Sequence, residues 1–134
     1  MPLISADEER RLFDKLVAYY ENLYPGMKFR KEEKTLSRDE IGEIHYTYPG
    51  EESEATFAEK VAAIGNAVTR GYDAPVIILR KEKEGKDILL DGHRRLKVAW
   101  GRGLGWKALI MVPSQEPKFG MEKMITGKIK EIWR

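Results

Sequence analysis

The segment from residue 88 to residue 98 constrains the fold of this chain more than any other part of the sequence. It reads Ile-Leu-Leu-Asp-Gly-His-Arg-Arg-Leu-Lys-Val, so an apolar strand leads into an Asp-Gly turn and then into a helix that begins with basic residues. Backbone N–H groups at a helix start have no intrahelical partner and carry the positive end of the helix dipole. A glycine there lets the backbone approach an anion, and arginines suit phosphate oxygens. The segment therefore predicts a phosphate-binding cradle.

The distribution of charge favours the same interpretation. Basic residues normally lie in the last turn of a helix, yet here Arg94 and Arg95 lie in the first turn. Residues 91–134 contain ten Lys and Arg against four Asp and Glu, whereas residues 1–90 contain fourteen against eighteen. The net charge of +2 thus conceals a basic C-terminal third, which fits an anionic ligand. The alternative is that these basic residues form a solvated helix face.

The order of segments around this motif resembles the ParB/sulfiredoxin superfamily. A helix-like segment that ends at residues 70–72 precedes two apolar, strand-like segments, 74–79 and 107–113, and the run Asp-Gly-His-Arg-Arg at 91–95 lies between them. The likeness covers about residues 55–113. It implies an α+β fold, with a ParB/sulfiredoxin-like mixed sheet packed against helices and extra helices at both termini.

Two branches of the superfamily can be compared with the motif residue by residue. In the ParB-like N-terminal domain a Gly-Glu-Arg-Arg-x-Arg box holds a nucleoside triphosphate. Gly92, Arg94 and Arg95 match this box, whereas His93 replaces the Glu and Lys97 replaces the last Arg. Sulfiredoxin carries a cysteine directly after the same glycine. This chain contains no cysteine, so that thiol chemistry is excluded.

The archaeal free serine kinases, a third branch, carry an Asp-Gly-x-His-Arg run. Asp91, Gly92 and Arg95 match it, but Arg94 stands where those kinases have the histidine. An acid just before the preceding helix is the catalytic base in those kinases. An acidic loop at residues 51–54 of this chain, Glu-Glu-Ser-Glu, occupies a comparable place, and we select Glu52 from it as the candidate base.

These observations define a candidate site. The expected phosphate- and nucleotide-binding residues are Gly92, His93, Arg94, Arg95 and Lys97. The expected catalytic residues are Asp91, Glu52 and His93, and Asp91 is also the expected Mg²⁺ ligand beside the bound phosphates. Structural alternatives stay open for these side chains, because Asp91 could cap the helix, His93 could be a simple helix-start residue and Glu52 could belong to a solvated loop.

Composition indicates the setting of the protein. The 134 residues are enough for one domain with its own core. A chain without cysteine, without a signal-like start and without a long apolar run is expected in the cytoplasm, with no membrane partner. Charged residues make up 34% of the chain and amides are scarce, a combination that favours a thermophilic source.

Hydrophobic periodicity predicts the remaining organisation. We expect a single domain over residues 1–134 with a core of about 36–113, and we interpret residues 28–36 as polar and irregular. The predicted flanking elements are an N-terminal helix at 5–24 and a C-terminal helix at about 118–133. The apolar stripe of the N-terminal helix is expected to pack either on the core of the domain or on a second copy of the chain, and in the second case the terminal helices would hold a homodimer together.

The function expected from the sequence is binding of a nucleotide (ATP, ADP or CTP) through its phosphates, with Mg²⁺, in a phosphotransferase or a nucleotide hydrolase. The alternative is a ParB-like nucleic-acid-binding module, DNA-binding or nuclease-like, without nucleotide turnover. Lysines and aromatic residues interleave over residues 106–133, and this pattern fits either a nucleic-acid surface or an ordinary amphipathic helix.

Overall fold

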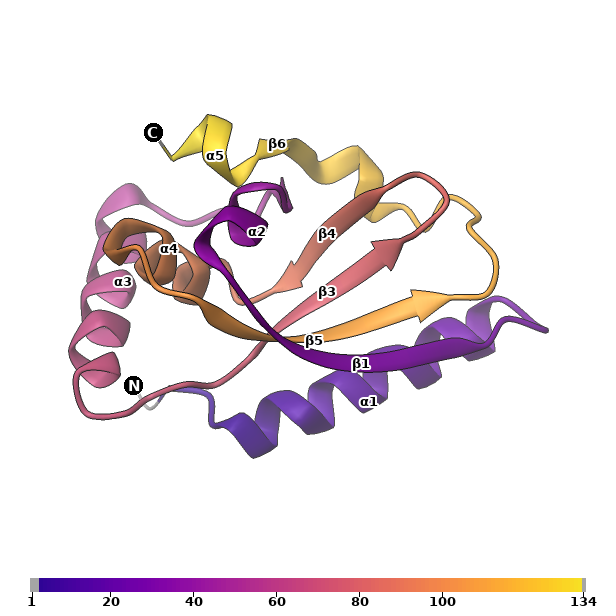
Figure 1. The fold of residues 1–134 in the computed structure, drawn as a ribbon, viewed down its shortest axis with the longest axis horizontal. Helices are drawn as coiled ribbons and strands as arrows, with labels where there is room; N and C mark the ends of the chain where they lie inside the picture. Colours follow the sequence, from indigo (N-terminus) through magenta and orange to yellow (C-terminus); the bar gives the residue numbers. More distant parts are fainter. Residues whose placement is uncertain (1–2, 134) are drawn as a thin grey trace.

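Six strands form one mixed sheet in the order β1-β5-β3-β4-β2-β6 in the computed structural model, which describes residues 3–133 (Figure 1). The β3–β5 and β2–β4 pairs are parallel, and the other three pairs are antiparallel. The strands are β1 Phe29–Leu36, β2 His45–Thr47, β3 Val76–Lys81, β4 Lys86–Asp91, β5 Trp106–Pro113 and β6 Ile125–Lys128. The helices are α1 Ala6–Leu23, α2 Arg38–Gly42, α3 Glu54–Val68, α4 His93–Arg102, the 3₁₀ helix η1 Met121–Met124 and α5 Ile129–Ile132. The predicted α+β class with a mixed sheet is confirmed.

Helices cover both faces of the sheet. The first four residues of the central strand β3 are all apolar, so both of its faces must be shielded from water. Successive side chains of a strand point to opposite faces. Ile77 and Leu79 therefore pack against Phe13 and Val17 of α1, while Ile78 packs on the other face in the core that includes α2 and α4. Figure 1 shows α1 running alongside β1 and β5, away from α2 and α4.

Serine side chains cap the first turns of three of the helices. Ser5 and Ser37 each accept a hydrogen bond from the N–H three residues later, and a glutamate at that position closes the capping box. Ser53 caps α3 in the same way, through the N–H of Thr56. The predicted N-terminal helix at 5–24 is confirmed as Ala6–Leu23.

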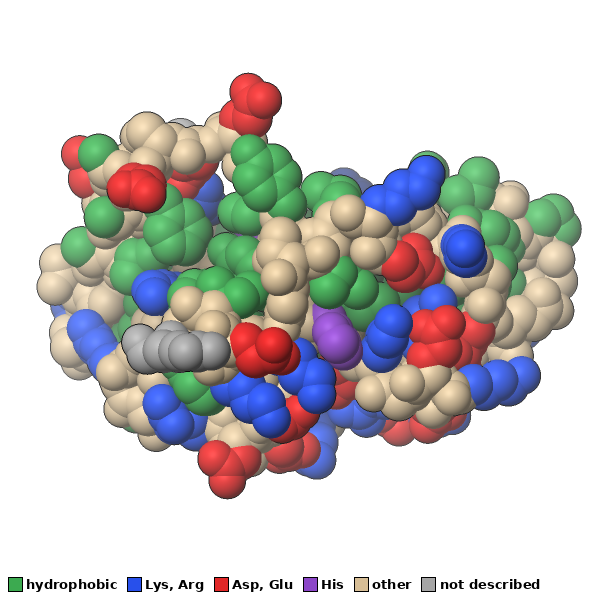
Figure 2. Space-filling view, turned by 90° about the horizontal axis from the view of Figure 1, so that it is seen from above, with side chains coloured by type: hydrophobic (Ala, Val, Ile, Leu, Met, Phe, Trp, Pro, Cys, Tyr) green, Lys and Arg blue, Asp and Glu red, His purple; other side chains and the backbone are tan. Residues whose placement is uncertain are grey.

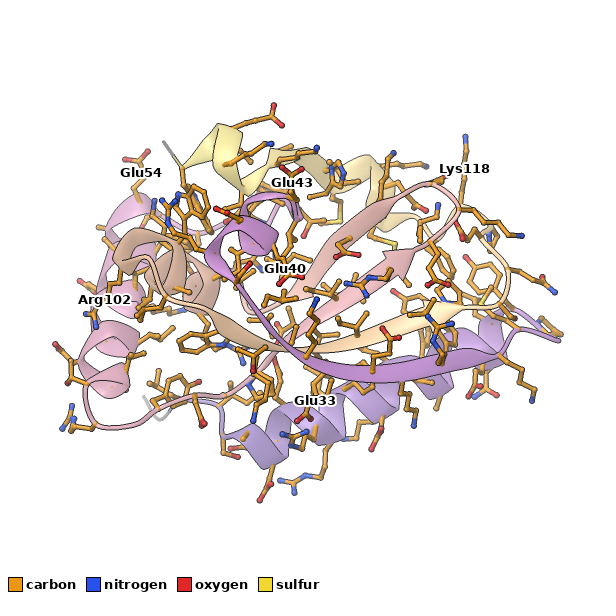
Figure 3. All side chains as sticks on the ribbon, viewed as in Figure 1. Glu33, Glu40, Glu43, Glu54, Arg102 and Lys118 are labelled. Carbon is orange, nitrogen blue, oxygen red and sulfur yellow. The ribbon has the colours of Figure 1, made fainter. Side chains whose placement is uncertain are left out.

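The interpretation of residues 28–36 as irregular is wrong, because residues 29–36 form β1. This edge strand pairs with β5 over eight residues, and Leu36 is its one buried position. Its charged side chains stay at the surface, where they pair with neighbouring elements. Glu33, which lies between β1 and α1 in Figure 3, pairs with Arg10 of α1. A polar edge strand lacks the apolar alternation that identifies other strands, which is why the sequence did not reveal it.

The prediction of one C-terminal helix over residues 118–133 is also wrong. This segment instead forms η1, the strand β6 and the single turn α5. Strand β6 pairs with the edge of β2, and Gly127 within it has φ of +145°, which only glycine adopts readily. Glu122 holds η1 in place, since it accepts hydrogen bonds from the N–H groups of Phe119 and Gly120 and from the ammonium of Lys81.

Two consequences follow for the predicted organisation. The sheet takes strands from residues 29 to 128, so the core extends beyond 36–113 at both ends. The predicted homodimer was to be held together by two terminal helices, and the C-terminal one of these is not formed. The N-terminal helix α1 uses Phe13 and Val17 to cover the sheet of its own chain. Within residues 3–133, none of the helices is long and apolar enough to cross a lipid bilayer.

Candidate functional site

The turn between β4 and α4 is built around Gly92. This residue has φ of +104°, and a Cβ placed on it would lie 2.8 Å from Cβ of Val76 and closer still to Cγ1. Glycine is therefore required both by the backbone conformation and by the close packing of β3. Among residues 3–133, no side chain caps α4, so Asp91 does not act as its N-cap. The start of α4 thus differs from those of α1, α2 and α3, which serine side chains cap, and resembles those of the short η1 and α5, which also lack a side-chain cap.

A cavity of about 880 Å³ opens at this helix start. Asp91, Gly92, His93, Arg94 and Arg95 all line it, so the fold brings together five of the seven predicted site residues. The rest of the wall comes from residues distant in sequence, namely Leu3, Ile4, Leu16, Tyr20, Thr47, Tyr48, Pro49, Gly50, Glu59, Lys60, Ala63, Ile64, Tyr72, Leu89, Leu90, Met121 and Met124. The cavity thus combines a polar region at α4 with largely apolar walls.

Arg95 is held inside the protein rather than presented to the cavity as a free cation. Only 5% of the surface of Arg95 is exposed to solvent. One guanidinium nitrogen donates to the carbonyl oxygen of Pro75 at 2.6 Å, and another lies 3.1 Å from Asp91 and 2.7 Å from Glu9. Arg95 therefore connects β4, α4 and α1, and a bound phosphate would have to share it with two carboxyl groups.

Glu9 of α1 is a member of this cluster that the sequence analysis missed. The residue is fully buried, and neither carboxyl oxygen accepts a hydrogen bond of good geometry from the described residues, although Arg95 lies within ion-pair distance. Burial, together with the carboxyl group of Asp91, raises the pKa of Glu9 to about 8, against the opposing effect of Arg95. Glu9 is therefore predominantly protonated at pH 7. Its spacing from Phe13 and Leu16 on the apolar side of α1 is the sequence signal that could have identified it.

Arg94 lies at the cavity wall in contact with Glu52. Its Nε donates to Oε1 of Glu52 at 3.3 Å and a second nitrogen donates to Oε2, while Lys60 lies 3.1 Å from the same carboxylate. The hydrogen bonds from Arg94 and Lys60 lower the pKa of Glu52, which makes it a weaker base than a free glutamate. The role of Glu52 as general base stays a prediction. Arg94 is more exposed than Arg95, so it is the arginine that can turn toward a ligand.

His93 is oriented by Thr47 of β2. The hydroxyl of Thr47 donates to the carbonyl oxygen of Leu89 at 2.7 Å and lies 2.9 Å from Nε2 of His93. Because a hydroxyl has a single proton, Nε2–H of His93 is the donor in the second contact and Nδ1 keeps the lone pair. Burial lowers the pKa of His93, against the smaller effect of Asp91, so the ring is neutral at pH 7. Tyr46 packs edge-on against it.

Lys97 stands apart from this arrangement, whereas the predicted metal ligand Asp91 belongs to it. The ammonium of Lys97 lies 4.8 Å from the ring centre of Trp133, and Lys97 is not among the described residues that line the cavity. No group of three His, Asp or Glu side chains within residues 3–133 could hold a metal ion. Mg²⁺ is often held by one carboxylate together with ligand phosphates and water, so Asp91 alone fits such a role only when a phosphate is bound.

No protein-family model matches the sequence, and the chain has no significant match to a curated protein or to a solved structure. The likeness to the ParB/sulfiredoxin superfamily therefore stays a prediction from sequence motifs. Inferences about function depend on the geometry of the cavity itself.

Proposed function

We propose that the protein binds the phosphate group of a nucleotide or a related organic phosphate in the cavity at the start of α4. The observation that carries this proposal is the uncapped N-terminus of α4, where Gly92 brings the backbone to the wall of a cavity of about 880 Å³. Free N–H groups and the helix dipole favour an anion there. The cavity lies within the size range of small-molecule sites in proteins.

Arg94 supplies the mobile cation in this proposal. A phosphate would replace Glu52 as its partner, and the planar guanidinium can donate two parallel hydrogen bonds to phosphate oxygens. The neutral His93 ring adds no charge of its own, and Arg95 holds Asp91 in position. If Mg²⁺ accompanies the phosphates, Asp91 is the residue that would contact it, and the ion would neutralise charge on the phosphate oxygens.

The proposal extends to phosphoryl transfer or hydrolysis. In such a reaction an acceptor hydroxyl or a water forms the new O–P bond, the bond between phosphorus and the leaving oxygen breaks, and the acceptor proton passes to a carboxylate. Asp91 is suited to take that proton, because its side chain is 39% exposed and lines the cavity. A cytoplasmic location is part of this proposal, since nucleotides are available there.

The surface favours a small ligand over nucleic acid. On the face seen in Figure 2, Lys and Arg side chains alternate with Asp and Glu, whereas nucleic-acid surfaces concentrate positive charge. Two lysines of the basic C-terminal segment, Lys128 and Lys130, both pair with Glu43, which lies beside that segment in Figure 3. This pairing lowers the positive charge that would face a phosphate backbone.

Replacement of Arg94 tests the proposal. We expect Arg94→Ala to weaken binding of ATP, ADP or CTP by about ten- to a hundredfold, since hydrogen bonds to charged groups contribute roughly 1.5–3 kcal/mol. Glu52→Gln should strengthen binding, because it removes the competing carboxylate. Isothermal titration calorimetry with and without Mg²⁺ measures both effects.

The matched control is Arg102→Ala at the other end of α4, an exposed residue whose guanidinium lies against Gly65 of α3, away from the start of α4 (Figure 3). It should leave the affinity unchanged. The proposal is wrong if the unmodified protein binds neither these nucleotides nor a simple organic phosphate such as methyl or octyl phosphate, or if Arg94→Ala and Arg102→Ala have the same affinity as the unmodified protein.

A further inference from the structure

The cavity extends along α1. Ile4, just before α1, and Tyr20, in the last turns of α1, both line it. These residues are sixteen positions apart, and at about 1.5 Å of rise per residue α1 places them roughly 20–24 Å apart. The wall of the cavity therefore extends along most of α1. Such a shape suits an elongated ligand.

The proposed phosphate position lies within this length and not at the far end. Arg95, in the first turn of α4, contacts Glu9 of α1 at 2.7 Å, so the start of α4 lies within reach of one arginine side chain from Glu9. Leu16 and Tyr20 follow Glu9 by seven and eleven residues, or about 10–17 Å of helix. Beyond the phosphate position, the cavity therefore continues for that distance toward the end of α1.

We call this continuation the long arm and define it by Leu16, Tyr20, Leu90, Met121 and Met124. Two of these residues come from α1, one from β4 and two from η1. They present aliphatic carbon, thioether sulfur, one aromatic ring and a single hydroxyl. Methionine side chains adapt to the shape of an apolar partner. The long arm is thus chemically distinct from the charged region at Asp91 and Arg94.

We infer that the ligand is an organic phosphate with an apolar body about 10 Å or more in length, and that this body lies in the long arm. The inference rests on the proposed function, because it assigns the phosphate of the same ligand to α4. A nucleobase is recognised by hydrogen bonds to its edge, and the long arm offers only the Tyr20 hydroxyl among its side chains. Nucleotides should therefore bind without preference among bases, and more weakly than a phosphate ester of an apolar chain.

Binding of a matched series of phosphates tests the inference. The probes are methyl phosphate, octyl phosphate below its micelle concentration, the four nucleoside monophosphates and octanol, titrated into the full chain by calorimetry. Octyl phosphate should bind at least tenfold more tightly than methyl phosphate, because part of its chain leaves water. The four nucleotides should bind with equal affinity and more weakly than octyl phosphate.

Two single substitutions locate the effect. Met124 lines the long arm and is 43% exposed, so Met124→Glu introduces a charge there without burying it in the core. It should remove the preference for octyl phosphate, because a carboxylate disfavours contact with the alkyl chain, and it should reduce the affinity for methyl phosphate far less than that for octyl phosphate. Leu104→Glu is the control, because Leu104 is similarly exposed, at 38%, and lies in the turn after α4. This variant should behave as the unmodified protein.

Failure of the inference and failure of the proposed function give different results. Equal affinities for methyl and octyl phosphate, both reduced by Arg94→Ala, would overturn the apolar body and keep the phosphate site. A preference for octyl phosphate that survives Met124→Glu would also overturn the inference. Octanol that binds as tightly as octyl phosphate, with no effect of Arg94→Ala, would overturn the phosphate site and the inference with it.

Discussion

Replacing Gly92 with alanine is expected to lower the free energy of unfolding by about 3 kcal/mol or more. The left-handed backbone at this position costs an alanine roughly 1–2 kcal/mol. The new methyl group would also lie 2.8 Å from Cβ of the fully buried Val76, and an overpacked core typically costs a further 1–3 kcal/mol. The backbone around the start of α4 must shift to relieve this contact, so the variant should also lose phosphate binding.

Gly71→Ala separates the two contributions. Gly71 has a similar φ of +94°, but no atom would lie within 4 Å of an added Cβ. This variant should therefore lose only about 1–2 kcal/mol, from the backbone conformation alone. Urea unfolding of the three proteins, followed by circular dichroism, measures both differences. Equal losses for Gly71→Ala and Gly92→Ala would show that Val76 does not restrict the turn.

The second large effect concerns pH and Glu9. Its pKa of about 8 in the folded protein lies above the ordinary value of 4.5, so the folded state binds a proton that the unfolded state releases between these two values. Stability therefore falls as the pH rises from about 4.5 to about 8. Each pKa unit corresponds to about 1.4 kcal/mol, so the fall is on the order of 3–5 kcal/mol. Asp91 and Arg95 contact the same group, and Tyr72 is near it, so this titration belongs to the cluster.

Glu9→Gln should remove most of this pH dependence. The amide keeps the shape of the protonated acid, so the variant should match the unmodified protein near pH 5 and exceed its stability near pH 8.5. Unfolding in urea at a series of pH values gives both curves. Parallel curves for the two proteins would contradict the assignment of a buried, protonated Glu9.

The neighbouring Glu8 provides a control of opposite sign. Hydrogen bonds within the capping box with Ser5 lower the pKa of Glu8. Its ionised form therefore favours the folded state above that pKa, and this contribution is lost as the pH falls. Glu8→Gln should accordingly reduce stability at neutral pH and have less effect in acid. The substitutions Glu9→Gln and Glu8→Gln should therefore change the pH dependence of stability in opposite directions, the first through a buried acid and the second through an exposed helix cap.

Features that depend on neighbours along the chain could be predicted from the sequence. The serine caps at Ser5, Ser37 and Ser53 each use a partner three residues away, so a short pattern suffices to reveal them. The apolar strand β3 and the Asp-Gly turn into α4 are similarly local. Residues 91–95 line one cavity together because they are consecutive in the sequence and follow that turn.

The tertiary structure alone decided the features that depend on distant partners. Strands β1 and β6 exist because β5 and β2 offer them hydrogen-bonding edges, and their own sequences carry little strand signal. Arg95 is restrained because α1 places Glu9 beside it, 86 positions away in the chain. The cavity owes its long arm to α1 and η1, which meet only in the folded protein. A local pattern reports the preferences of its own residues, whereas pairing, burial and charge balance depend on the segments that the fold brings alongside.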